Sequence, residues 1–131
     1  MSITYRWRGP VDNAALETLH AEGFDHAPAD YDWRSQLETH SLGWVTAHQD
    51  GGLIGFVNVV WDGATHAFVL DTLVARAARG NRVGTRLVEI AVEEARAAGC
   101  EWLHVDFDDD LLGFYFESCG FEPTNAGLIA L

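Results

Sequence analysis

The spacing of hydrophobic and polar positions changes along the chain between a period of two, typical of strands, and a period near 3.6, typical of helices. These patterns predict strands over residues 2–8, 44–48, 53–61, 66–74 and 101–107, helices over 11–22, 30–42, 85–98 and 111–118, and a final strand or hairpin arm over 121–131. The order β-α-α-β-β-β-α-β-α-β places hairpins in the first half and a strand-helix-strand crossover in the second. It predicts an α/β (α+β) fold of one domain, residues 1–131, in which helices flank both faces of a mixed central β-sheet.

The helix over residues 85–98 is the most strongly patterned element. Its apolar stripe consists of Leu87, Ala91, Ala95 and Ala98, and its solvated face consists of Arg86, Glu89, Glu93 and Arg96. Opposite charges three residues apart support the solvated face, and Gly99 supplies a common helix end. The strand over 53–61 is apolar at nearly every position, which predicts a central strand covered on both faces.

Composition narrows the classes of function. The chain of 131 residues is 48% hydrophobic and 21% charged, as expected of a folded globular domain. Its formal net charge of −12 argues against a nucleic-acid partner and an anionic membrane surface, since both require a basic face. The N-terminal MSITYRWRG contains no apolar core of a signal sequence, and no apolar run approaches the roughly 20 residues of a transmembrane helix. We therefore expect a cytoplasmic protein with no nucleic-acid or membrane partner.

The spacing of cysteines and histidines gives no support for a metal site. Cys100 and Cys119 are the two cysteines, they form no zinc-type spacing, and no HExxH motif occurs. We expect both thiols to be reduced, as is usual in the cytoplasm, and no metal cofactor.

All eight basic residues are arginines, and four of them fall between residues 76 and 86. One interpretation is a solvated basic loop, and the other is a site for a polyanion such as a phosphate-bearing cofactor. The segment joins a predicted strand to the helix over 85–98, so its backbone N–H groups meet the positive end of the helix dipole. Gly80 and Gly84 allow close approach of a ligand, although their spacing matches neither the P-loop nor the GxGxxG fingerprint.

The segment Arg79-Gly80-Asn81-Arg82-Val83-Gly84 resembles the pyrophosphate loop Gln/Arg-x-x-Gly-x-Gly/Ala of the GCN5-related N-acetyltransferases (GNAT family). Arg82 stands where the family usually has its central glycine. A second segment is similar to the family pattern L-x-V-x-x-x-N-x-x-A-x-x-F-Y-E-K-x-G-F, with these residues in register: Leu103, Val105, Glu117, Gly120 and Phe121. One helix and one strand separate the two segments, as in the family, and the order of elements extends the resemblance over the whole chain.

The family's tyrosine is displaced by one position in this sequence. Phe116 occupies the usual tyrosine position, and Tyr115 precedes it. One residue corresponds to about 100° around an α-helix. Two alternatives are therefore open: a rotated or bulged helix brings Tyr115 to the cofactor sulfur, or Tyr115 packs as a core aromatic beside Phe114 and Phe116.

The resemblance implies a GNAT fold, acetyl-CoA as the co-substrate, and direct transfer of the acetyl group to a primary amine. It implies that acetyl-CoA lies between the strands over 66–74 and 101–107. The residues expected to hold it are Leu73, Val74, Arg79, Gly80, Asn81, Arg82, Val83, Gly84 and Thr85. Tyr115 is the candidate proton donor to the departing thiolate, and Asp71, a carboxylate among apolar neighbours, is the preferred base. The alternative bases are Glu38, His40, His48, His104 and Asp106.

The acidic remainder of the chain favours a small or cationic amine as acceptor, and a peptide amine is also compatible. Frequent dimerisation in the family and the apolar residues 127–131 allow a homodimer. Two other hypotheses stay open. One is a CoA-binding or sensing module that has lost catalysis, motivated by Arg82 and Phe116 at the family's glycine and tyrosine positions. The other is an interaction protein that keeps only the fold.

Overall fold

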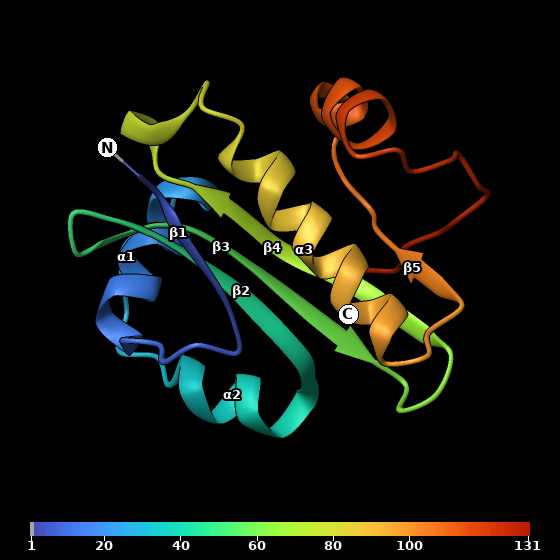
Figure 1. Ribbon diagram of the computed structural model, residues 1–131, viewed down its shortest axis with the longest axis horizontal. Helices are drawn as coiled ribbons and strands as arrows, with labels where there is room; N and C mark the ends of the chain where they lie inside the picture. Colours follow the sequence, from blue (N-terminus) through green and yellow to red (C-terminus); the bar gives the residue numbers. More distant parts are fainter. Residues whose placement is uncertain (1) are drawn as a thin grey trace.

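Five strands form one sheet in the spatial order β1-β2-β3-β4-β5, in a computed structural model that describes residues 2–131 (Figure 1). The strands are β1 (Thr4–Trp7), β2 (Ser41–Gln49), β3 (Gly52–Trp61), β4 (His66–Val74) and β5 (Trp102–His104). Neighbouring strands from β1 to β4 are antiparallel, whereas β4 and β5 are parallel. Antiparallel neighbours can be joined by short turns, but the parallel pair requires a crossover, which the third helix provides.

Three α-helices cover the two faces of the sheet: α1 (Asn13–Phe24), α2 (Trp33–His40) and α3 (Val83–Ala97). The buried side of α3 packs on one face, and its members in that core are Val83, Leu87, Ala91 and Ala95. On the other face α1 and α2 pack around Leu16, Leu37 and Phe56, each of which is 0% exposed. The predicted fold class, a mixed sheet flanked by helices on both faces, is therefore confirmed.

Aspartate side chains begin both helices of the second face. At the start of α1, Asp12 Oδ1 accepts a hydrogen bond from the Ala15 N–H at 3.0 Å, and at the start of α2, Asp32 Oδ1 accepts one from the Ser35 N–H at 3.2 Å. Such caps satisfy donors of the first helical turn that have no partner within the helix. Asn13 Nδ2 donates to Asp32 Oδ1 at 3.1 Å, so the starts of the two helices are joined.

β4 contains a bulge near its carboxyl end. The pairing register between β3 and β4 shifts between Phe56 and Asn58, where one residue of β3 faces two residues of β4, Asp71 and Thr72. Asp71 has a φ angle of 54°, a backbone region that residues with a side chain rarely adopt. A bulge interrupts the ladder and redirects the side chains beside it, so this part of β4 differs from a regular strand.

The segment after α3 departs most from the sequence prediction. The strand predicted over 101–107 pairs with β4 over Trp102–His104, after which the chain leads away from β4 (Figure 1). The helix predicted over 111–118 is instead a 3-10 turn, η2 (Asp109–Leu111), followed by a π-helical turn, η3 (Gly113–Ser118). The N–H of Cys119 bonds the carbonyl of Phe114 at 3.0 Å, which is the five-residue spacing of a π-helix.

The final strand or hairpin arm predicted over 121–131 is wrong, because these residues form no strand in the described chain. Pro123 has no backbone N–H to donate, and Asn125 and Gly127 disfavour strands, so the segment cannot sustain a ladder. Leu128 and Ile129 are 86% and 83% exposed. The consecutive apolar residues 128–131 are therefore an exposed segment and not a paired strand.

Within residues 2–131, no helix combines the length and the apolar character needed to cross a membrane. Cys100 and Cys119 are both half-buried free thiols.

Candidate active site

A cleft of about 1100 Å³ opens where β4 and β5 separate. The two strands pair over His66–Phe68 and Trp102–His104. Beyond these residues β4 continues to Val74, while the chain after β5 turns away from it (Figure 1). The lining comes from the second half of β4, the end of α1, the loop before α3 and its first turn, the segment from Val105 to Tyr115, and residues 126–128. The strands predicted to hold the co-substrate are thus the ones that diverge.

The N-terminus of α3 forms one end of this cleft. Its N-cap residue, Arg82, has φ 58° and ψ 22°, a left-handed conformation that favours glycine, and its side chain makes no capping hydrogen bond. The first-turn residues Val83, Gly84 and Thr85 line the cleft. The N–H groups of a first turn lack partners within the helix, and the helix dipole adds positive potential there. This end of the cleft is therefore suited to a phosphate group.

Two glycines shape the same end. Gly80 has a φ angle of 85°, which a residue with a side chain would adopt only under strain. A Cβ added to Gly84 would lie 3.1 Å from two ring carbons of Phe114. Glycine at this position therefore allows η3 to pack closely against the start of α3.

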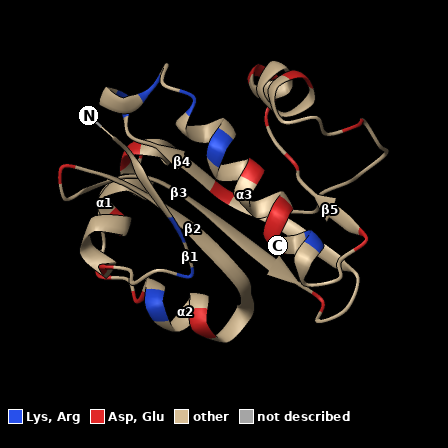
Figure 2. Ribbon diagram, viewed as in Figure 1, with Lys and Arg blue, Asp and Glu red and all other residues tan. Residues whose placement is uncertain are grey.

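The clustered arginines are divided between the cleft and its surroundings. Arg79 and Arg82 line the cleft. Arg76 and Arg86 instead form ion pairs, with Glu22 of α1 at 3.9 Å and with a glutamate of α3 at 3.2 Å, respectively. Figure 2 shows the arginine segments gathered on the loop before α3 and at its first turns. Two of the four arginines thus supply positive charge to the cleft itself.

Tyr115 enters the cleft from η3. Its side chain is 5% exposed, and its hydroxyl donates a hydrogen bond to Thr72 Oγ1 on β4 at 3.1 Å. Phe107 stacks on its ring with 4.7 Å between centroids. Burial raises the pKa of the Tyr115 hydroxyl and the Thr72 hydrogen bond opposes this rise, so the hydroxyl keeps its proton at neutral pH. The π-helical turn places Tyr115, and not Phe116, in the lining.

Asp71 lies in the bulge of β4 and lines the cleft. Its side chain is 24% exposed, and its Oδ1 lies 3.3 Å from Nε2 of His20 on α1. Backbone conformations that cost energy gather at functional positions, so the positive φ of Asp71 marks it as a candidate. A carboxylate here faces the space between the separating strands.

The alternative bases have weaker positions. Asp106 lines the cleft from an exposed position. His104 Nε2 faces His66 Nδ1 at 2.9 Å on the paired part of β4 and β5. His48 lines a separate cavity of about 30 Å³. The remaining two lie on the exposed side of α2, namely Glu38 and His40.

Three aspartates lie on the wall that follows β5. Asp106, Asp108 and Asp110 all line the cleft, and Figure 2 shows acidic segments along the chain after β5. Together with Asp71 they give the rest of the cleft a negative character. The cleft therefore favours an anion at its α3 end and a cation elsewhere.

Most residues predicted for the site come together in this cleft. They are Asp71, Leu73, Val74, Arg79, Gly80, Arg82, Val83, Gly84, Thr85 and Tyr115. Asn81 is outside the lining, and its Nδ2 donates to the Ala78 carbonyl at 3.1 Å, which closes the loop before α3. Sequence reasoning missed Thr72, a direct neighbour of Asp71, and His20, which carries no local signal. Among residues 2–131, no group of three or more potential metal ligands is assembled.

Residues 10–121 match the model of the Acetyltransferase (GNAT) family. Over 57 residues the chain is 42% identical to glucosamine 6-phosphate N-acetyltransferase 1 of Oryza sativa subsp. japonica. That match covers 44% of this chain and 34% of the rice protein, so it spans about a third of the relative's length.

Solved structures share the fold at low sequence identity. An acetyltransferase of Trypanosoma brucei has a TM-score of 0.84 at 17% identity, covering 98% of this chain and 99% of that one. The structure of AAC(6')-Iy in complex with the bisubstrate analog CoA-S-monomethyl-acetylneamine has a TM-score of 0.77 at 17% identity, covering 100% of this chain and 98% of that one. At such identity these likenesses concern the fold alone.

The match over residues 10–121 shows that the chain belongs to the acetyltransferase (GNAT) family, whose members use acetyl-CoA to acetylate amines. The predicted resemblance and the predicted class of enzyme, N-acetyltransferase, are confirmed at the level of the family.

Proposed function

We propose that this chain transfers the acetyl group of acetyl-CoA directly to a primary amine, and that the acceptor is a small or cationic amine. The observation that carries the proposal is the cleft itself. It has a helix N-terminus with Arg79 and Arg82 at one end, and Asp71 and Tyr115 on its walls. The rice relative, named for an amino sugar phosphate, is consistent with an amine acceptor.

The basic end of the cleft fits the pyrophosphate of acetyl-CoA. Backbone N–H groups of residues 79–85 would donate to its oxygens, and the two cleft arginines would add charge-assisted hydrogen bonds. Directly after β4, the Ala75 N–H donates to the Ile54 carbonyl of β3 at 2.8 Å. Because backbone groups alternate in direction along a strand, the Val74 N–H is directed to the cleft side. It and the Val74 carbonyl, which points the same way, would hold the pantetheine arm and polarise the thioester carbonyl, while Leu73 would contribute as part of the cleft lining.

The chemistry requires one base and one donor. The acceptor ammonium loses a proton to Asp71, directly or through water, and becomes a nucleophile. As the N–C bond forms and the C–S bond breaks, the hydroxyl of Tyr115 donates to the departing thiolate. Thiols ionise near pKa 8.5, below the raised pKa of Tyr115, so the hydroxyl stabilises the thiolate by a hydrogen bond and keeps its own proton, and the thiolate takes its proton from water after release.

The acidic wall supports the choice of acceptor. Asp106, Asp108 and Asp110 stand across the cleft from β4. They would attract a cationic amine, raise its local concentration and repel an acceptor that carries a carboxylate. A peptide with an exposed amine satisfies the same chemistry if its neighbouring residues are not acidic.

An acetylation assay that follows release of the CoA thiol tests this proposal. The acceptors are spermidine, glucosamine, a neutral peptide with a free amine, and glutamate as the anionic comparison. We expect turnover with at least one cationic or small amine, a lower kcat/KM for glutamate, and loss of about 100-fold or more in kcat/KM for Asp71→Asn. Equal rates for glutamate, or full activity of Asp71→Asn, would contradict the proposed acceptor and base.

A second candidate function is a CoA-binding or sensing module that has lost catalysis. The observation that favours it is Arg82, whose side chain stands at a left-handed position where the family pattern has glycine. This candidate predicts acetyl-CoA binding with no turnover of any amine in the same panel. Measurable turnover excludes it.

We also propose a cytoplasmic homodimer. The exposed apolar side chains of Leu128 and Ile129 support the dimer, because such residues are more stable when a partner covers them. Light scattering tests it: the expected mass is twice 14.4 kDa, and a mass of 14.4 kDa contradicts the dimer.

A further inference from the structure

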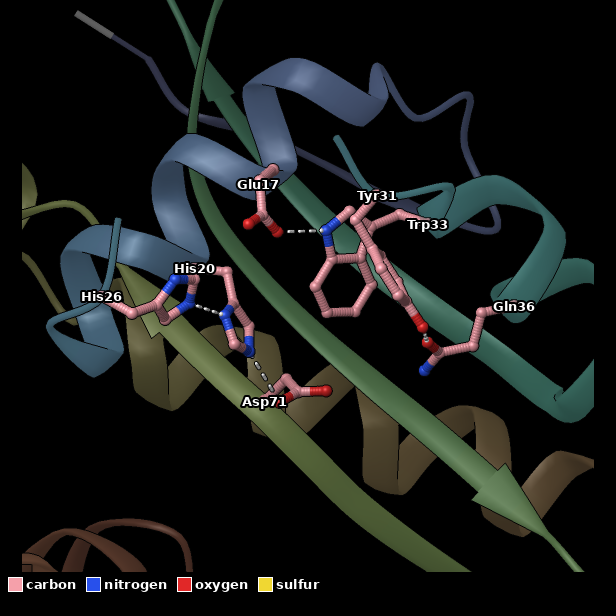
Figure 3. A network of polar contacts seen from close by, with 7 residues as sticks. All are labelled: Glu17, His20, His26, Tyr31, Trp33, Gln36 and Asp71. Carbon is pink, nitrogen blue, oxygen red and sulfur yellow. Dashed lines mark hydrogen bonds and ion pairs between the residues drawn. The ribbon is translucent and has the colours of Figure 1, made fainter. Parts of the chain in front are cut away.

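Two histidines connect Asp71 to the surface of the molecule (Figure 3). His20 Nε2 lies 3.3 Å from Asp71 Oδ1, and His20 Nδ1 lies 2.7 Å from His26 Nε2. His26 Nδ1 in turn lies 2.9 Å from the carbonyl oxygen of Ala27. The contacts thus form one unbranched chain from the bulge of β4, through α1, to the exposed loop that follows α1.

The number of protons in this chain follows from the chemistry of its members. A carbonyl oxygen only accepts, so His26 Nδ1 carries a proton. Each of the other two contacts also needs one proton between its two atoms, which makes three in total. Two neutral imidazoles carry two protons. When all three hydrogen bonds are made, Asp71, His20 and His26 therefore hold three protons between them. This is one proton more than two neutral imidazoles and a carboxylate would carry.

The surroundings favour that additional proton. Glu17, one turn before His20 on α1, is buried and accepts hydrogen bonds from the Ala29 N–H at 2.9 Å and from Trp33 Nε1 at 3.0 Å. These bonds, the Ala29 one first, lower the pKa of Glu17, which therefore stays negatively charged beside the two imidazoles. Uncharged rings complete the environment of His20: Phe24 at 4.7 Å and Trp33 at 5.0 Å between centroids.

Asp71 faces both the cleft and this series of hydrogen bonds. Its Oδ1 points to His20, while Figure 3 shows the other carboxylate oxygen directed away from that histidine. Asp71 also belongs to the cleft lining, whereas His20 and His26 do not. The two histidines can therefore act on a substrate only through Asp71.

We propose that His20 and His26 form a proton relay that orients Asp71 and carries to solvent the proton that Asp71 takes from the acceptor. This inference rests on the proposed function, in which Asp71 is the base. In the step, an N–H bond of the acceptor ammonium breaks and an O–H bond forms on Asp71. The relay starts one proton short of the fully bonded state, with His20 Nε2 unprotonated. The proton passes from Asp71 to His20 Nε2, the Nδ1 proton of His20 passes to His26 Nε2, and the Nδ1 proton of His26 leaves the Ala27 carbonyl for water.

The relay predicts that three groups titrate as one unit, and nuclear magnetic resonance of the protein without substrate tests this. Ring nitrogens of His20 and His26 and the carboxyl carbon of Asp71 are followed against pH. We expect shifts of all three at a common pH and low-field ring protons on the two histidines. Asp71→Asn should change the titration of both histidines. The His66–His104 pair, joined at 2.9 Å, is the matched control and should titrate as before.

Independent titration of the three groups would overturn the relay, whether or not the protein acetylates amines. Failure of the proposed function has a different signature, since it is absence of acetyl-CoA binding or turnover in the unaltered protein. The two failures are therefore distinguishable.

Kinetics separate proton removal from a structural role of the histidines. Benzylamine is an ammonium ion at pH 7, whereas benzhydrazide is a neutral amine of similar shape. We expect His20→Gln and His26→Gln to lower kcat/KM about tenfold or more for benzylamine and to shift its pH profile to higher pH, with less than threefold change for benzhydrazide. His66→Gln, which breaks the other histidine pair at a residue outside the cleft lining, should affect neither acceptor. Equal losses for both acceptors would assign His20 and His26 to structure alone and overturn the relay.

Discussion

The hydroxyl of Tyr115 lies 3.1 Å from Oγ1 of Thr72, so the π-helical turn on one wall of the cleft is joined to the bulge of β4 on the other. Thr72 is the direct neighbour of Asp71. A single hydrogen bond therefore brings the candidate donor to within one residue of the candidate base. Both irregular elements, the π-turn and the bulge, contribute to this arrangement.

Removing the hydroxyl of Tyr115 should reduce the rate and not the binding of the co-substrate. Tyr115→Phe keeps the ring that packs on Phe107 but cannot donate to the thiolate. We expect kcat to fall about 100-fold with acetyl-CoA affinity unchanged within about twofold. Thr72→Val is the control, because it removes the partner of the hydroxyl and leaves the hydroxyl itself. Similar kcat values for Tyr115→Phe and the unaltered protein would remove Tyr115 from the mechanism.

Glycine at position 82 should make the chain more stable and bind the co-substrate more weakly. Arg82 has a φ angle of 58°, and a left-handed backbone costs a residue with a side chain about 1 kcal/mol. We expect Arg82→Gly to raise the free energy of unfolding in urea by about 1 kcal/mol and to weaken acetyl-CoA binding about tenfold, since a charge-assisted hydrogen bond is lost.

The control for that prediction is Arg86→Ala, which removes a charge from an ion pair with Glu93 outside the cleft lining. It should leave acetyl-CoA affinity within about twofold, because surface ion pairs contribute little. A lower stability of Arg82→Gly would show that the arginine side chain stabilises the loop more than its backbone strains it.

The protein should lose stability in alkaline solution. Burial, with a smaller contribution from Glu89, raises the pKa of Cys119 to about 11, and burial also raises the pKa of Tyr115. Folding therefore disfavours both anions. The stabilisation is fully present below the ordinary thiol pKa of 9.0 and is lost as the pH rises toward about 11.

Thermal unfolding between pH 7 and 11 checks this behaviour. The Tm should stay level up to about pH 8.5 and then fall, and Cys119→Ser should show a smaller fall because the buried thiol is gone. A Tm that is constant to pH 11 would contradict the burial of these two groups.

Glu17 should be important for stability at neutral pH and less so in acid. It accepts bonds from the Ala29 N–H and from Trp33 Nε1, and a glutamine there would place a donor against a donor. We expect Glu17→Gln to lower the free energy of unfolding by about 1 to 3 kcal/mol at pH 7. Because the pKa of Glu17 is lowered, its contribution is present above the ordinary value of 4.5 and is lost as the pH falls through the folded value.

Urea unfolding of both proteins at pH 7 and pH 3 measures the difference. The difference in the free energy of unfolding between the unaltered protein and Glu17→Gln should be smaller at pH 3 than at pH 7. A gap that is equal at the two pH values would mean that the charge of Glu17 is not what its partners bind.

Regular elements with a clear period could be predicted from the sequence. Of the predicted apolar stripe of α3, Leu87, Ala91 and Ala95 are buried on the sheet, whereas Ala98 is wrong because it follows the last residue of the helix and is exposed. The arginine and glycine pattern before it likewise predicted the basic end of the cleft, since those residues are adjacent in the chain. The residues that define these two features are near one another in the sequence, so their pattern alone was sufficient to predict them.

The irregular and distant features could not be predicted. The π-turn of η3 depends on packing of Tyr115 against β4, and an apolar pattern over 111–118 does not distinguish it from an α-helix. Residues 121–131 end in four apolar residues but have no partner strand in the described chain. His20 and Asp71 are 51 residues apart in sequence, so their contact depends on how α1 packs against β4.

Titration calorimetry with acetyl-CoA measures whether the start of α3 holds the co-substrate. The unaltered protein should bind acetyl-CoA in the micromolar range. A comparison of dephospho-CoA with CoA measures the contribution of the 3′-phosphate to the affinity. The Arg79→Ala, Arg82→Ala double variant should bind at least about 100-fold more weakly, because two charge-assisted contacts are lost. Unchanged affinity in that variant would place the co-substrate away from the start of α3, and no binding by the unaltered protein would contradict the account as a whole.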